Sequence, residues 1–182
     1  MDDQLEPIHP GPWGEFPDRY WSTYFGDEAT YYMAELGRLR TGQSLDFRWA
    51  AFFLSMLWMV YRRMYVIAAC AMGLVLLEST LEEALYALLA PGKLAQSVFE
   101  LLISLAVNTA MGYYANRVYL WDARRNIRQV LVELPHAHEA EVLAAIARRG
   151  GSSMGAVLVF LALSVVAGIA LTYGLSSFFT LW

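Results

Sequence analysis

The stretch Gly-Ser-Ser-Met-Gly at residues 151–155 matches the G-x-S-x-G pattern of hydrolases, in which a strand-to-helix turn exposes a serine beside a histidine base. No strand pattern precedes it here, and its glycines lie where a loop must lead into an apolar run. Capping the following helix is the ordinary role of Ser152 or Ser153 in such a place. We therefore predict no catalytic residue in this motif.

Two histidines offer a second possible chemistry, metal binding. His136 and His138 are two residues apart, with Glu139 and Glu141 close behind. A zinc site on a helix needs ligands four residues apart, and a closed site needs four ligands. The single cysteine, Cys70, lies in a distant apolar run. We predict a solvated loop here, with metal binding as the alternative, and no cofactor.

Polar and small residues recur every four positions in the second apolar run of the chain. Such a stripe lies on one face of a helix, where small and amide side chains let neighbouring helices approach and form hydrogen bonds. A similar row of small residues occurs in the third run. We predict that both faces pack against other helices, with a transport path as the alternative, through Ser104, Asn108, Gly112, Asn116, Tyr119, Ser164, Gly168 and Thr172.

Four arginines follow the second apolar run, on what we expect to be the same helix. A basic side chain beside the bilayer gains about 1 kcal/mol from anionic lipid. Nucleic-acid binding would need a basic face turned away from the bilayer, and acidic residues dilute this one. We predict contact with lipid headgroups, and not with nucleic acid, for Arg117, Arg124, Arg125 and Arg128.

The elements that hold these residues follow from composition. Hydrophobic residues make up 58% of the 182 residues and charged residues 16%, whereas soluble domains have roughly 45–50% and about 25%. Residues 155–182 carry no ionisable group except the phenol of Tyr173. A run of that length exceeds the ~20 apolar residues that cross a bilayer. The sequence therefore predicts an all-α membrane protein.

The first crossing needs more care, because Arg62 and Arg63 divide its apolar residues. Residues 49–60 form a run of about 18 Å at 1.5 Å per residue, too short to cross. A span starting at Trp49 would bury both arginines at roughly 2.5–3.5 kcal/mol each. We predict an aromatic interfacial helix and then a span from Tyr61, with the arginines reaching headgroups. The interfacial residues are Trp49, Phe52, Phe53, Trp58, Tyr61, Arg62, Arg63, Met64 and Tyr65.

The rest of the chain divides around three predicted spans. We expect an irregular tail over residues 1–23, a helical region over 24–60 with a short helix at Asp27–Leu39, and a membrane domain over 61–182. Its spans cover about 61–80, 94–118 and 155–180, with a helical loop at 119–154. A short amphipathic helix should follow the first span over Leu81–Lys93, and the second span should continue as one helix toward Pro135.

Orientation follows from the arginines, which flank the start of the first span and fill the loop between the second and third. The connection between the first two spans holds three glutamates and one basic residue, Lys93. The positive-inside rule therefore predicts a cytoplasmic N-terminus and an external C-terminus.

The block from Tyr24 to Tyr65 resembles the bacterial domain of unknown function family 2628. Family members look like small inner-membrane proteins with a W-A-A-F-F core followed by W and Y-R-[KR]-M-Y, which Trp49–Phe53, Trp58 and residues 61–65 match in order and spacing. Gly112, Asn116 and Tyr119 resemble a second family element. Family members usually carry Gly-Pro where Ser55-Met56 stands, so this chain lacks that helix break, and the sequence leaves open whether residues 49–60 are re-entrant or lie flat. The resemblance implies placement and helical architecture, and no activity.

We predict a multi-pass protein of the bacterial inner membrane with three spans. Our leading functional expectation is a non-enzymatic accessory, assembly or stabilising subunit of a larger membrane complex, because no catalytic set emerges and the aromatic surface exceeds what three helices can bury. The expected partners are membrane lipids and that complex, with a homo-oligomer as a possibility. The alternative is a small transporter or channel component that uses the polar stripe on the second span.

Overall fold

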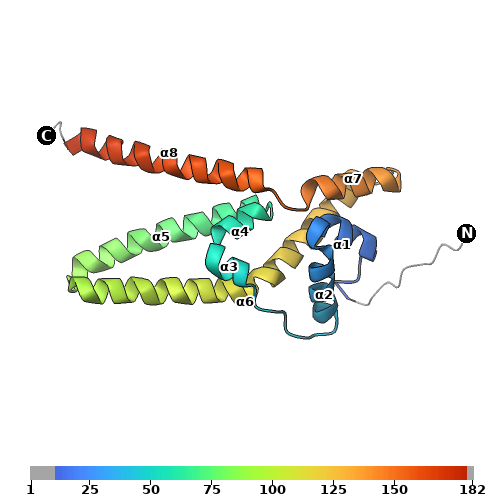
Figure 1. Cartoon of the computed structure of the whole chain (residues 1–182), viewed down its shortest axis with the longest axis horizontal. Helices are drawn as coiled ribbons and strands as arrows, with labels where there is room; N and C mark the ends of the chain where they lie inside the picture. The colour runs from blue at the N-terminus through green and yellow to red at the C-terminus, as the bar shows by residue number, and fades with distance from the viewer. Residues whose placement is uncertain (1–10, 180–182) are drawn as a thin grey trace, which may run out of the picture.

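The computed structural model describes the backbone of residues 11–179 and the side chains of residues 11–170. Every regular element in this part of the chain is a helix, and three helices are long and apolar enough to cross a membrane. These are α5 (Tyr65–Leu89), α6 (Lys93–Glu133) and α8 (Met154–Phe179), shown in Figure 1. The predicted all-helical fold with three candidate spans is confirmed.

Shorter helices gather beside one end of the candidate spans. They are α1 (Asp18–Phe25), the 3₁₀ turn η1 (Gly26–Glu28), α2 (Ala29–Arg40), α3 (Trp49–Leu54), α4 (Met56–Tyr61) and α7 (Glu139–Arg149). Helices α1, α2 and α7 pack around the last part of α6. We call this unit, residues 11–46 with residues 115–150, the head. Helices α3 and α4 join the head to the spans.

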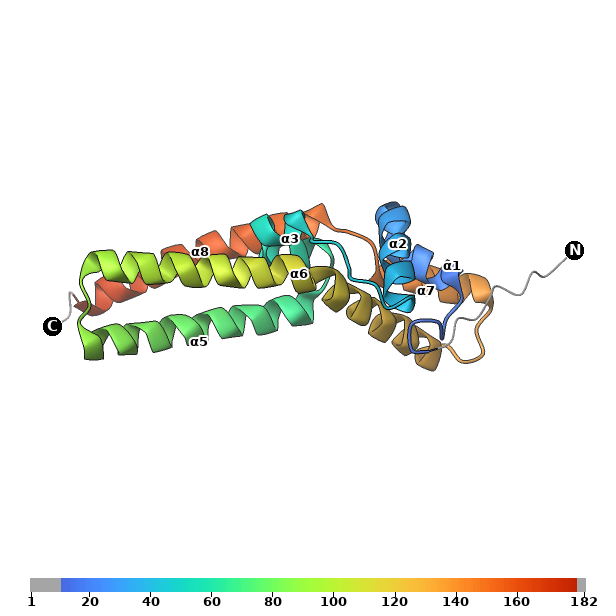
Figure 2. The same ribbon diagram turned by 90° about the horizontal axis from the view of Figure 1, so that it is seen from below.

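Helices α5 and α6 form a long hairpin that turns at residues 90–92 (Figure 2). Helix α6 then runs on into the head without a break, as predicted, because no proline interrupts residues 93–133. It ends just before Pro135, since the residue preceding a proline is disfavoured in helical conformation. One helix therefore carries both the predicted polar stripe and the core of the head.

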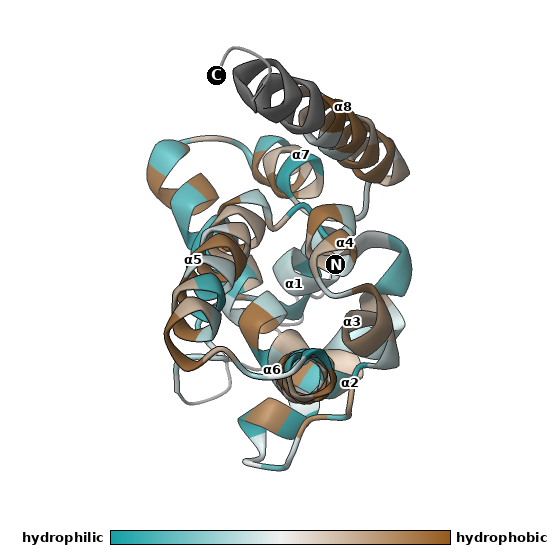
Figure 3. Cartoon of the chain, turned by 90° about the vertical axis from the view of Figure 1, so that its left-hand side faces the viewer, coloured by the Kyte–Doolittle hydropathy of each residue, from teal (hydrophilic) through white to brown (hydrophobic). Residues whose placement is uncertain are grey.

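The head owes its stability to a core of aromatic and aliphatic side chains. Trp21, Phe25, Tyr32, Tyr119 and Ile127 are fully buried. The rings of Tyr32 and Tyr119 lie 4.5 Å apart and those of Phe25 and Tyr32 lie 5.3 Å apart. Burying each such side chain stabilises the fold by about 1.5–3 kcal/mol. Outside the head, hydrophobic residues are exposed along α8 and α5 (Figure 3).

Two predicted boundaries were wrong. The tail expected over residues 1–23 is helical from Asp18, because the prolines end at Pro17 and Trp21, Tyr24 and Phe25 form a buried stripe at helical spacing. The described part of the tail, residues 11–17, packs on the head through Trp13 and Glu15. Residues 1–10 lie outside the described part of the chain.

The first span is also longer than predicted. Instead of a span over 61–80 and a separate helix over Leu81–Lys93, a single helix runs from Tyr65 to Leu89. The hydroxyls of Ser79 and Thr80 donate to the carbonyls of Val75 and Leu76, at 2.9 and 2.8 Å, so these residues stay within the helix. The helix begins at Tyr65 and not at Tyr61 because Arg63 has a left-handed φ of 58°.

The aromatic segment bends sharply, which decides a point that the sequence left open. Ser55 has a φ of 43° and separates α3 from α4, although the Gly-Pro pair of the family is missing. Packing supplies the bend, because α3 lies against α6 while α4 packs on α5 and α8. The predicted helix over residues 49–60 is therefore two helices that face different neighbours.

Candidate functional site

Arg62 lies at the centre of the most unusual cluster in the structure. It follows α4 at the junction between the head and the spans, and its side chain is 1% exposed. Its guanidinium carbon lies 4.8 Å from the Tyr32 ring centroid and 5.4 Å from that of Tyr119, and it forms an ion pair with Glu28. The prediction that Arg62 reaches lipid headgroups was therefore wrong, because a carboxylate and aromatic faces solvate it inside the protein.

Glu28 also binds a second arginine from the loop before α3. Arg48 Nη2 donates to Glu28 Oε2 at 2.6 Å, and its guanidinium carbon lies 4.4 Å from the Tyr31 ring centroid. Burial raises the pKa of the Tyr32 phenol to about 12, even though Arg62 and Arg48 lower it. Tyr32 therefore stays protonated at neutral pH, and the two arginines are not paired with a tyrosinate.

Asn116 on α6 fixes the neighbouring loop. Its fully buried side-chain amide lies within hydrogen-bond distance of three acceptors, Tyr31 Oη at 2.8 Å, the Asp46 carbonyl at 3.0 Å and Glu35 Oε2 at 3.2 Å. Glu35 also accepts from Arg38 Nη1 at 3.0 Å. The sequence prediction that Asn116 is a packing residue fits this arrangement, although its partners come from α2 and its loop and not from another span.

A second polar group lies deeper in the head. The hydroxyl of Tyr24 donates to Asp122 Oδ2 at 3.2 Å, and Asn126 Nδ2 donates to the same oxygen at 3.0 Å. Burial, followed by the negative charge of Asp122, raises the pKa of Tyr24. Tyr24 is 2% and Asp122 is 8% exposed, whereas Asn126 is only partly buried. We read both polar groups as structural.

The remaining predicted interfacial residues divide into two sets. Trp49 and Phe53 are 63% and 72% exposed and pack on Phe52. Trp58 and Met64, in contrast, are buried in the junction. Three further residues belong to neither set. Tyr65 is half exposed, and the Tyr61 ring lies under Arg62. Arg63 donates to the Arg148 carbonyl at 2.7 Å. A lipid interface is thus open only to the α3 aromatics and Tyr65.

The predicted stripe on α6 changes character along its length. Gly112 faces the ring of Phe47, where a Cβ atom would approach Phe47 Cε1 to 2.8 Å. Asn108 Nδ2 lies 3.4 Å from Ser104 Oγ, on a part of the helix that no other element covers. On α8, Ser164 donates to the Phe160 carbonyl at 2.8 Å. Gly168 lies one turn further on, and the Thr172 side chain is outside the described residues.

A groove separates the two arms of the hairpin. Helices α5 and α6 do not pack closely along their length but enclose a mainly apolar space of about 610 Å³, lined by Leu74, Leu81, Ile103 and Val107 among others. A smaller space of about 290 Å³ adjoins it, lined by carboxylates and by the exposed part of the stripe: Glu78, Glu82, Glu100, Ser104 and Asn108. Sequence patterns could not bring these three glutamates together, because Glu78 and Glu82 lie on α5 and Glu100 lies on α6.

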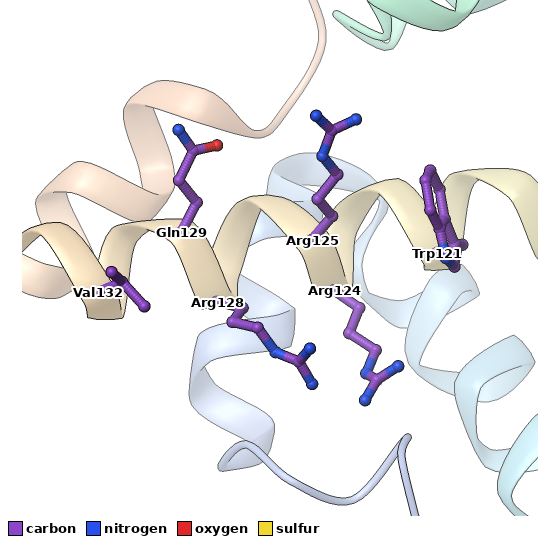
Figure 4. A pocket seen from close by; sticks show the side chains of 6 residues that line it. All are labelled: Trp121, Arg124, Arg125, Arg128, Gln129 and Val132. Carbon is purple, nitrogen blue, oxygen red and sulfur yellow. The ribbon is translucent and has the colours of Figure 1, made fainter.

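The four arginines predicted at lipid headgroups have different partners. Arg117 is exposed where α6 leaves the hairpin. Arg124 and Arg128 bind the carboxylate of Glu15. Arg125 lies over the Trp121 ring, at 6.0 Å from its centroid. The last three line a pocket of about 480 Å³ on the head, shown with its other residues in Figure 4.

The serine and histidine motifs remain apart from one another. Ser153 Oγ accepts from the Ala156 amide at 3.2 Å, which is the capping role predicted for this motif. His136 and His138 lie in the turn between α6 and α7. No group of three metal-binding side chains occurs among residues 11–170.

Comparison with known proteins gives a family and no activity. No curated protein and no solved structure matches the chain. Residues 28–125, which include Glu28, Arg62, Asn116 and the hairpin, match a family described as protein of unknown function. Since that match covers more than half of the 182 residues, this protein belongs to the DUF2628 family.

Proposed function

We propose that this chain is a non-enzymatic accessory or assembly subunit of a larger complex in the bacterial inner membrane, with its head in the cytoplasm. The observation that carries the proposal is the open groove between α5 and α6. Of the most apolar 18-residue stretches in the three candidate spans, 6% of the residues are buried in α5 and none in the other two. These stretches therefore contribute little to the packed core of this chain.

The polar residues beside the groove indicate what should fill it. A carboxylate at the centre of a spanning helix costs roughly 2.5–3.5 kcal/mol when it faces lipid. Glu78, Glu82 and Glu100 face the same small space as Ser104 and Asn108. A helix of a partner protein, with hydrogen-bonding side chains at this depth, would remove that cost. We infer that the partner enters between α5 and α6.

A photo-crosslinking amino acid at Ile103, which lines both spaces, tests this inference in native membranes. We expect one discrete protein adduct, because the proposed partner occupies the groove that Ile103 lines. The same amino acid at Leu101, which is 67% exposed and points elsewhere, is the matched control and should give no protein adduct. Purification from mild detergent as a lone monomer, without an adduct at Ile103, would contradict the proposal.

The small space lined by three glutamates supports a second candidate function, a transporter or channel component. In that case water fills the groove. In a Cys70→Ser background, a cysteine at position 107 would then react with a membrane-impermeant thiol reagent in intact membranes. Replacement of Asn108 or Glu100 by leucine would abolish flux while the protein still inserts. A partner helix predicts the reverse, with Val107→Cys protected until the complex is dissolved.

A further inference from the structure

The basic pocket on the head binds one carboxylate of this chain, that of Glu15, and lies apart from the hairpin groove. Trp121, Arg124, Arg125, Arg128, Gln129 and Val132 line it, and all lie on the part of α6 beyond the spans (Figure 4). We propose that this pocket binds an acidic segment of a protein partner. Carboxylates of that segment bind the arginines of the pocket, and its apolar side chains contact Trp121 and Val132.

An intrachain carboxylate already shows how the arginines bind such a group. Arg124 donates from Nε and Nη2 to the two oxygens of Glu15, both at 2.9 Å, as a planar two-bond fork. Arg128 Nη2 adds bonds of 3.0 and 2.7 Å to the same oxygens. The Glu15 side chain keeps 25% of its exposure. Partly exposed ion pairs contribute about 1 kcal/mol or less, so an external carboxylate can displace it.

The other half of the pocket has no such occupant. Arg125 forms no ion pair with any residue that the structure describes; it lies over Trp121 and acts electrostatically on the Asp122 carboxylate. Trp121 and Val132 are 50% and 73% exposed. With Arg125 and Arg128, these residues are spaced four, three and four apart, so they share one helix face. A basic face with an apolar residue at each end matches an acidic peptide with apolar anchors.

The position of the pocket argues against lipid as the ligand. Arm α5 of the hairpin has 25 residues, and the equivalent length of α6, counted from Lys93, ends at Arg117. At 1.5 Å per residue, Arg128 lies about 16 Å further along α6. The headgroup layer is only about 5–7 Å thick on each side of the bilayer. Arg117 can reach it, whereas Arg125 and Arg128 lie beyond it.

This inference deepens the proposed function, since it gives the complex a second contact outside the membrane. The two can fail separately. The crosslink at Ile103 reports only on the groove between α5 and α6, and peptide binding reports only on the head. Loss of one result therefore leaves the other interpretable.

The test measures binding of a fluorescein-labelled hexaglutamate peptide to the full chain in phosphatidylcholine nanodiscs, by fluorescence anisotropy. Wild type should bind. Glu15→Gln should bind about fivefold tighter, because the intrachain competitor is gone, and Arg125→Gln about fivefold weaker. Arg117→Gln removes the same charge from the same helix and is the matched control, with a change of less than about twofold.

Four results would overturn the inference. Equal binding by wild type, Glu15→Gln and Arg125→Gln would leave the pocket without a role, and an equal loss in Arg117→Gln would reduce the effect to general charge attraction. Loss of peptide binding when phosphatidylglycerol replaces phosphatidylcholine would assign the arginines to lipid. A single-stranded oligonucleotide that binds as tightly as the peptide would assign them to nucleic acid. Arg125 supports no ion pair in the fold, so its variant stays interpretable if Glu15→Gln misfolds.

Discussion

At the scale of residues, Arg62 shows how far the meaning of a side chain depends on partners that sequence does not place beside it. An arginine next to an apolar run normally reaches for headgroups. Here Glu28 comes from the turn η1, Tyr32 from α2 and Tyr119 from α6, and together they surround it. A buried guanidinium held in this way fixes the relative position of α2, α4 and α6.

Replacement of Arg62 by alanine should therefore destabilise the head. The change removes desolvated cation–π contacts of up to about 2 kcal/mol and leaves a cavity, so we expect a total loss of roughly 3 kcal/mol. Chemical unfolding followed by tryptophan fluorescence measures it. Arg125→Ala, at an exposed arginine without an ion pair, should change stability by less than about 0.5 kcal/mol. Equal stabilities of wild type and Arg62→Ala would show that Arg62 is dispensable.

Glu15 predicts a dependence on pH. Hydrogen bonds from Arg124, and next from Arg128, hold the pKa of Glu15 below its ordinary value, although partial burial opposes them. A carboxylate with a lowered folded-state pKa adds stability above its unfolded pKa of about 4.3, and this stability disappears as the pH falls through the folded value. Wild type should thus exceed Glu15→Gln by about 1 kcal/mol at pH 7 and by nothing at a pH near 3. A difference that persists in acid would contradict this account.

At the scale of elements, helix ends depend on backbone positions that composition only partly reveals. The continuity of α6 and its end before Pro135 could be predicted, because they follow from proline chemistry. The bend at Ser55 could not, since serine carries no signal for a φ of 43° and tertiary packing imposes it. Helix α1 could not be predicted for the same reason, because its aromatic stripe forms a core only with the helices that pack on it.

Ser55→Gly should stabilise the protein. A positive φ costs a residue with a Cβ atom roughly 1–3 kcal/mol, and glycine is relieved of most of it, so we expect a gain of about 1 kcal/mol. Thermal unfolding of the purified protein checks this. Ser44→Gly, in the exposed loop between α2 and α3 and without a positive φ, should give no gain. Lower stability in Ser55→Gly would mean that the serine side chain is needed.

Gly150→Ala should have the opposite effect. A Cβ atom there would lie 2.8 Å from the carbonyl carbon of Tyr24, which is backbone and cannot move aside. We expect a loss of about 2 kcal/mol or more. Gly37→Ala is the matched control, because open space surrounds that position inside α2 and alanine favours a helix by about 0.5–1 kcal/mol. A neutral Gly150→Ala would show that α1 can shift away from the α7–α8 loop.

At the scale of the whole molecule, the chain combines a packed head with spans that hardly touch. Composition predicted the spans, because a helix must be long and apolar to cross a bilayer. It could not predict the head, since residues 18–40 and 115–150 fall on opposite sides of the boundary expected near residue 60 and meet only through the return of α6. The groove likewise depends on the splay of two helices, which no sequence pattern records.

Three spans predict that the two chain ends lie on opposite sides of the membrane. A fluorescent reporter that folds only in the cytoplasm should be active on the N-terminus, and a phosphatase active only outside should be active after Trp182, because the arginines of the head favour the cytoplasm. Fusion of each reporter to the other end is the control and should be silent. If both ends lay on the same side, one of the three helices would not cross the membrane.

The start of α8 is held by main-chain hydrogen bonds as well as by packing of Ala156, Val157 and Phe160 on the core. The Gly151 amide donates to the Tyr24 carbonyl at 2.7 Å, and the Ser153 amide donates to the Tyr61 carbonyl at 2.9 Å. Since the Tyr24 hydroxyl also donates to Asp122, one residue of α1 contacts both the loop that leads into α8 and the helix that carries the arginines. A displacement of the third span relative to the head would therefore have to break the bond from the Gly151 amide or move Tyr24 with it.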